Sequence, residues 1–161
     1  MATAITGRTS IVGEPAQRKT GAKMQPCPEA SSQTYPRGAL LIKSAGFVNM
    51  HTTSFVSVSL YGLAARSGRN GTADGDKNAN VWRFQADQPF KMAMSGTFTA
   101  TNRGATAALS QNTAGVCFLV TASSASDSSV VRIIDAVPPF TVGDVNPVVY
   151  FVPLTAKIQE G

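Results

Sequence analysis

The clearest pattern in the chain is an alternation of apolar and polar side chains at residues 55–61, Phe-Val-Ser-Val-Ser-Leu-Tyr. In an extended segment, two valines and a leucine share one face and the two serines share the other. A period of two is typical of a β-strand with one buried face. The sequence therefore predicts a half-buried strand here, which residues 62–65 continue or bend.

Short apolar runs recur along the rest of the chain, and segments rich in Gly, Asn, Asp and Ser separate them. Short strands between frequent turn signals are typical of sandwiches and barrels. The turn-rich residues 66–80 predict a loop, and residues 105–111 predict at most a brief helical turn. We therefore expect an all-β fold, a jelly-roll-like sandwich or small barrel with an extended N-terminal arm, and no helix longer than about two turns. The predicted strands lie near residues 39–42, 81–84, 90–94, 116–120, 130–134 and 148–152.

The expected core consists of the large apolar side chains inside these runs, because aromatic residues within strands pack in the interior by default. We assign to it Val58, Leu60, Trp82, Phe84, Phe118, Val120, Ile133 and Phe151.

Residues 1–37 differ from the rest of the chain, since they combine four prolines with charge and show no sustained period. Such a segment buries too little apolar surface to offset its ordering entropy. We predict a flexible or extended N-terminal arm at 1–37 and a β-sandwich domain at 38–161. Deleting residues 1–30 should then leave a folded domain. The exceptions, which could dock on a partner or on the arm's own domain, are Ile5, Ile11, Val12 and Tyr35.

The composition favours a protein that contacts other proteins. Only 14% of the 161 residues are charged, against about a quarter in typical soluble domains. A surface of small polar residues loses its water easily and suits permanent contacts, although secreted β-proteins share this property. The net charge of +5 fits either an anionic partner or no particular partner. No run of four Lys or Arg occurs, so we expect no direct contact with nucleic acid.

Candidate chemistry is sparse. His51 is the only histidine, and we interpret it as a surface or loop residue. With Cys27 and Cys117 it cannot complete a four-ligand zinc site without carboxylates. Cys117 looks buried, where a thiolate is disfavoured, and a disulfide between the two cysteines is not favoured. Residues 74–78 resemble the start of a calcium loop but lack its later glycine and glutamate. We expect no enzyme activity, no cofactor and no metal, and we see no secretion signal or membrane span.

Several stretches together carry a resemblance to a known family. Residues 38–41, 61–65, 81–84 and 89–90, with the closing stretch 135–154, resemble head cement (decoration) proteins of tailed double-stranded DNA bacteriophages. The resemblance is one of overall style over most of residues 38–156. It implies a compact β-domain on the outside of the capsid, often trimeric, whose terminal arm clamps neighbouring major capsid subunits.

The expected function is therefore that of a structural virion protein, made in the host cytoplasm, which stabilises a capsid by bridging major capsid protein subunits. It would act as a homotrimer or other homo-oligomer, without a membrane partner. Two alternatives stay open beside it, a carbohydrate- or host-binding β-sandwich module and a tail or collar component of a virion; a hydrolase with an unrecognised site is a further one. The expected interface residues in the arm are Ile5, Arg8, Ile11, Val12, Arg18, Lys19 and Lys23.

Overall fold

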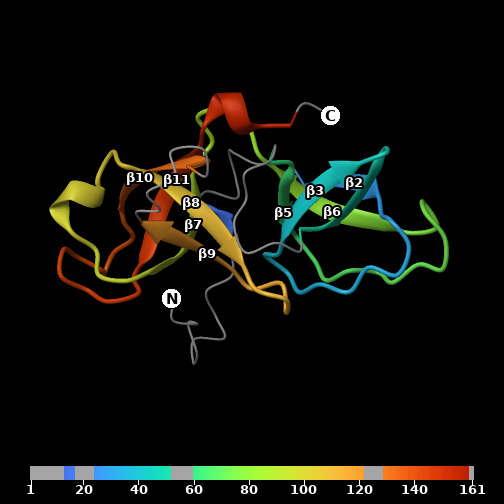
Figure 1. The fold of residues 1–161 in the computed structure, drawn as a ribbon, viewed down its shortest axis with the longest axis horizontal. Coiled ribbons are helices and arrows are strands. Elements are labelled where there is room, and N and C mark those ends of the chain that lie inside the picture. The colour runs from blue at the N-terminus through green and yellow to red at the C-terminus, as the bar shows by residue number, and fades with distance from the viewer. Residues whose placement is uncertain (1–12, 17–23, 52–59, 122–128, 160–161) are drawn as a thin grey trace.

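A computed structural model describes residues 13–16, 24–51, 60–121 and 129–159. β-Strands dominate it, and the described residues include no α-helix, only two short 3-10 turns at Ala100–Asn102 and Thr155–Lys157. The expectation of an all-β fold is therefore confirmed. Figure 1 shows the strands in two groups that lie side by side along the longest axis of the molecule.

The first group is a closed barrel of five strands in the order β7-β11-β10-β8-β9. Neighbours in this order are antiparallel, and β9 returns to β7 as a parallel neighbour that pairs Leu119 with Met94. A two-residue strand, β1 (Glu14–Pro15), adds to β7. The barrel strands are β7 (Phe90–Ser95), β8 (Thr106–Gln111), β9 (Cys117–Thr121), β10 (Val131–Ala136) and β11 (Val148–Pro153).

The second group is a five-stranded sheet in the order β2-β6-β5-β3-β4, again with antiparallel neighbours. Just after β2, Glu29 forms a parallel bridge with Val48 of β4, so the two outer strands of this sheet meet. Its strands are β2 (Met24–Pro28), β3 (Leu40–Ser44), β4 (Phe47–Met50), β5 (Gly62–Ala64) and β6 (Asn78–Arg83).

Two clusters of buried side chains form the interior. The larger one combines side chains from inside the barrel with side chains of β3, β5 and β6 in the second sheet. It includes Phe84, Phe90 and Phe151, whose ring centroids lie 4.9–6.5 Å apart. The smaller one lies in the second sheet around Tyr35 and Tyr61. Of the expected core residues, six are buried, Val120 is half-buried, and Val58 lies outside the described residues. The six buried ones are Leu60, Trp82, Phe84, Phe118, Ile133 and Phe151.

The described part of the expected arm packs on its own chain, which corrects the predicted boundary at residue 37. Strand β2 pairs with β6 along its length, and Cys27 and Tyr35 are buried in the smaller core. Pro26 and Pro28 fit this strand because alternate residues of an antiparallel strand donate to the neighbouring strand. The Glu29 N–H donates to the Lys77 carbonyl at 2.9 Å, so the nitrogens of the two prolines point away from β6. Deleting residues 1–30 would remove β1 and β2, so we now expect this deletion to destabilise the fold.

Residues 106–111 form strand β8 rather than a helical turn, because all six have extended partners in β9 or β10. Pairing and burial thus override the helix preference of an alanine-rich segment. Residues 55–59 of the predicted alternating strand lie outside the described residues, and β5 begins at Gly62.

Side-chain amides join the two groups of strands. Gln111, at the end of β8, is 2% exposed. Its Oε1 accepts from the Leu40 N–H at 2.5 Å, and its Nε2 donates to the carbonyls of His51 at 2.6 Å and Leu40 at 3.3 Å. Gln159 pairs in the same way with both main-chain groups of Lys43. Each amide therefore hydrogen-bonds to both the N–H and the carbonyl of one β3 residue, as a neighbouring strand would.

Candidate protein-binding surface

The arm residues expected to form the interface all lie outside the described residues, so the structure brings none of them together. They are Ile5, Arg8, Ile11, Val12, Arg18, Lys19 and Lys23. The described residues nearest to them, 13–16, seat β1 against β7. Glu14 there forms ion pairs of 2.9 Å with both Lys91 and Arg37.

One end of the barrel carries two long loops, residues 96–105 and 137–147, which we call the barrel loop end (Figure 1). Main-chain hydrogen bonds pair them: the Phe98 N–H donates to the Asp144 carbonyl at 2.9 Å, and the Gly143 N–H donates to the Phe98 carbonyl at 2.8 Å. Asn146 binds Gly96 through its N–H and through its side-chain oxygen. Since Phe98 is fully buried beneath the loops, this end of the barrel has a fixed shape.

Arg103, Asp135 and Asp144 at the barrel loop end each form an ion pair or hydrogen bond within the protein. The Arg103 guanidinium donates to Asp135 at 2.9 Å, and this hydrogen bond, with a second from the Ala136 N–H, lowers the pKa of the Asp135 carboxyl. Asp144 accepts from the Thr141 N–H at 2.7 Å. A partner can therefore approach this end without separating a large excess of charge from water.

Two exposed valines lie in one of these loops, residues 137–147. Val142 is 47% exposed and Val145 is 63% exposed, which makes Val145 the most exposed large apolar side chain among the described residues. Val142 stands between Thr141 and Gly143, and Val145 between Asp144, whose carboxylate accepts from the Thr141 N–H, and Asn146. Exposed apolar side chains on a pre-ordered backbone favour protein contact, because burying them gains free energy and little order must be created.

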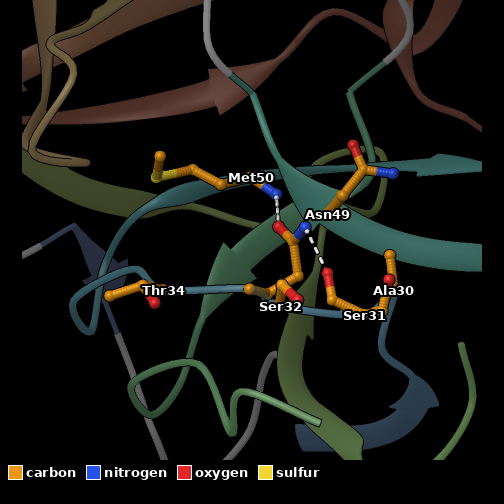
Figure 2. Close-up of a pocket in the computed structure, with 7 residues that line it drawn as sticks. Ala30, Ser31, Ser32, Thr34, Asn49 and Met50 are labelled. Carbon is orange, nitrogen blue, oxygen red and sulfur yellow. Dashed lines mark hydrogen bonds between the residues drawn. The ribbon is translucent and has the colours of Figure 1, made fainter. Parts of the chain in front are cut away.

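The second sheet offers a different feature, an open depression of about 570 Å³ beside the segment that follows β2 (Figure 2). It is lined by residues 30–34 with Asn49 and Met50. Gln33 accepts from the Met50 N–H at 2.9 Å and donates to the Ser31 carbonyl at 3.3 Å. The lining contains hydroxyls and amides but no ionised group and no aromatic ring, so it lacks a stacking platform for a sugar.

A buried carboxylate, Glu29, directly precedes the segment that lines this depression. Glu29 is 1% exposed and accepts three hydrogen bonds, from the Tyr35 hydroxyl and from the N–H groups of Arg69 and Asn70. Burial, followed by the bond to Glu29, raises the pKa of Tyr35. Glu29 thus fixes the loop of residues 66–77 onto the segment that follows β2.

The other candidate residues do not form a reactive centre. His51 is buried rather than on the surface, because it follows β4 at the junction of the two groups of strands. Cys117 is buried as expected, and burial raises the pKa of its thiol to about 12. Cys27 and Cys117 are both free thiols, and Cys27 lies 3.0 Å from the Tyr61 hydroxyl.

Trp82 is 9% exposed, with the Arg37 guanidinium 5.1 Å from its ring centroid. It therefore presents no open face for carbohydrate stacking.

Within the described residues, no group of three or more His, Cys, Asp or Glu side chains is arranged to hold a metal ion. The same residues contain no helix with the length and apolarity to cross a membrane. No protein-family model and no curated protein matches the chain.

The sequence contained a signal for the barrel loop end that charge-based reasoning missed. Residues 137–147 hold three prolines, two exposed valines and one acidic residue, which is an unusual composition for a solvated loop. The partner loop, residues 96–105, lies about forty residues earlier in the sequence, so only the fold reveals that the two form one surface.

Proposed function

We propose that this protein is a non-enzymatic structural component of a virion, which binds the outer surface of a phage capsid and stabilises it by bridging major capsid protein subunits. The observation that carries the proposal is the barrel loop end, where Val142 and Val145 project from loop 137–147, which is hydrogen-bonded to loop 96–105. The low share of charged residues and the resemblance to head cement proteins point in the same direction.

The physical requirements of such a role match these features. A filled shell is under outward load, and a protein that bridges subunits adds interface that must break before the shell ruptures. Rigid loops bind with little loss of entropy, and repetition over the shell multiplies modest contacts through avidity. The barrel supplies the rigidity, since its five strands close on themselves.

The direct test is binding of the full-length chain to expanded, DNA-free shells assembled from the cognate major capsid protein, measured by co-sedimentation. The double variant Val142→Asp with Val145→Asp should lose binding, because a partner surface would have to bury two unpaired carboxylates. The matched control is Val116→Asp, a valine of 44% exposure on the β8–β9 turn at the opposite end of β8.

Thermal unfolding of all three proteins checks that each variant is folded. Shell binding by the double variant at the wild-type level would remove the barrel loop end from the proposal. Failure of the wild-type chain to bind shells would refute the capsid function itself and favour the tail or collar alternative.

A further inference from the structure

The two groups of strands share one topology. Numbered in chain order within each group, the first strand lies beside the fifth, the fifth beside the fourth, the fourth beside the second, and the second beside the third. All four pairings are antiparallel in both groups. The third strand then meets the first in parallel, through β9 and β7 in the barrel and through the Glu29–Val48 bridge in the second sheet. Because five strands can close in many orders, agreement in both order and direction indicates a repeated unit.

A short sequence motif repeats at matching places. Residues 75–82 and residues 143–150 both read Gly-Asp-x-Asn-x-x-Val followed by an aromatic residue. In each half, the motif runs from the loop between the fourth and fifth strands into the fifth strand, β6 or β11. The rest of the two halves has diverged too far for the repeat to be visible in the sequence.

The glycine of the motif makes the same contact in both halves. Gly75 has a φ of 79° and Gly143 a φ of 100°, values that strongly favour glycine. The Gly75 N–H donates to the Glu29 carbonyl at 2.9 Å, just after the first strand of its half. The Gly143 N–H donates to the Phe98 carbonyl at 2.8 Å, also after the first strand. Glu29 and Phe98 are thus structural equivalents.

The aspartate of the motif also has one role in both halves, which is to close the loop in front of it. Asp76 accepts from the Thr72 N–H at 3.2 Å, and Asp144 accepts from the Thr141 N–H at 2.7 Å. The shared strand order, the shared motif and these shared contacts are independent observations. Together they show that both halves are built on one five-stranded scaffold.

The repeat gives the barrel loop end a counterpart. Residues 29–35 and 66–77 occupy the same places in the second sheet as residues 96–105 and 137–147 in the barrel, and we call them the second loop end. Figure 1 shows the two loop ends at opposite extremes of the longest axis. We infer that the chain is a tandem duplication of one module and that the second loop end is a second protein-binding surface. This inference rests on the proposed capsid function.

The chemistry of the second loop end indicates its partner. Arg66 and Arg69 are exposed, and no carboxylate within the described residues pairs with either. The nearby Asp74 and Asp76 keep their charge, but each carboxylate is held against a main-chain N–H of this loop end, Asp74 at Ser31 (2.7 Å) and Asp76 at Thr72 (3.2 Å). The buried Glu29 holds the Arg69 main chain in place. The occupant that fits is an acidic face on a neighbouring subunit of the shell protein.

A chain with binding surfaces at both ends connects two subunits by its body, independently of its N-terminal residues. The two contacts should respond differently to salt. Contacts of exposed arginines with an acidic face weaken as ionic strength rises, whereas burial of Val142 and Val145 does not weaken in this way.

Photo-crosslinking on decorated shells tests the inference with the full-length chain. Ala73→Cys and Thr141→Cys place a thiol two residues before the motif glycine at each end, and the buried native cysteines stay unlabelled. Each thiol receives a maleimide benzophenone, and Val116→Cys on the β8–β9 turn is the control. Both end positions should crosslink to the shell protein, at two different peptides, and the control should not.

Charge reversal complements the crosslinks. Arg66→Glu with Arg69→Glu should abolish the Ala73 crosslink, keep the Thr141 crosslink, and slow association by about tenfold or more at low salt. Arg132→Glu, an exposed arginine on β10, should change neither crosslink.

Normal shell occupancy without an Ala73 crosslink would overturn the inference and leave the proposed function standing. Absence of co-sedimentation by the unlabelled wild-type chain would instead refute the proposed function, and the inference with it.

Discussion

Replacing Gln111 with methionine should destabilise the protein strongly, because this buried amide joins the barrel to the second sheet. Methionine preserves the length and volume of the side chain but removes all three hydrogen bonds. The Leu40 N–H then has no acceptor in an environment that water does not reach.

The size of the effect follows from these contacts. A buried donor left unsatisfied costs about 1–3 kcal/mol, and the lost bond to the His51 carbonyl adds about 0.5–1.5 kcal/mol. The apolar methionine side chain offsets roughly 1 kcal/mol by its own burial. We therefore expect the free energy of unfolding to fall by about 0.5–3.5 kcal/mol, with a central value of about 2 kcal/mol.

Gln159→Met is the matched control, because Gln159 makes the same two-sided contact with Lys43 in a half-exposed place. Water can replace those bonds, so the loss there should stay below about 1 kcal/mol. Urea unfolding followed by the fluorescence of Trp82, the single tryptophan, measures both variants. Equal losses for the two variants, or no loss for Gln111→Met, would refute the argument that burial makes the Gln111 contact strong.

Four further predictions follow from the described contacts. Phe151→Ala should lower the free energy of unfolding by about 3–5 kcal/mol, because its ring is fully buried against Phe90; a loss below 1 kcal/mol in urea unfolding would contradict this packing. Cys117, with a pKa near 12, should stay unreactive toward a thiol reagent at pH 8 until the protein unfolds, and rapid native labelling would contradict its burial. Since Asp135 has a lowered pKa in the folded state, its ion pair should stabilise the protein above about pH 4 and lose that effect as the pH falls through the folded pKa; an NMR titration of Arg103→Gln should show the Asp135 pKa rising, and an unchanged value would exclude Arg103 as the cause. Deleting residues 1–12 alone, which spares β1 and β2, should leave the melting temperature nearly unchanged and weaken shell binding; unimpaired binding would remove these residues from the interface.

Periodicity and apolar runs predicted the fold class and the positions of most barrel strands. Runs at 90–94, 116–120, 130–134 and 148–152 fall on β7, β9, β10 and β11. Strands buried on most of both faces, such as β7, give nearly continuous apolar segments, whereas β10 alternates between buried and exposed residues. Composition gave the wrong secondary structure for two segments whose conformation is decided by pairing with neighbouring strands. The two prolines of β2 indicated an arm, and the alanines of β8 indicated a helical turn.

The candidate site was harder to predict from the sequence than the fold. Charge and apolar content singled out seven residues between positions 5 and 23, all of which lie outside the described residues. The barrel loop end instead depends on pairing between loops about forty residues apart. The duplication was also hidden, because it is preserved in strand order and in main-chain contacts that many side chains permit. Only the glycine and aspartate of the repeated motif are specified by those contacts.

An electron cryomicroscopy map of the cognate expanded shell, with and without the full-length protein, tests the central claim most directly. The account predicts added density on the outer surface that fits the elongated pair of strand groups, with its two loop ends touching two different major capsid subunits. Added density only at the tail or collar, or none on the shell at saturating protein, would contradict it.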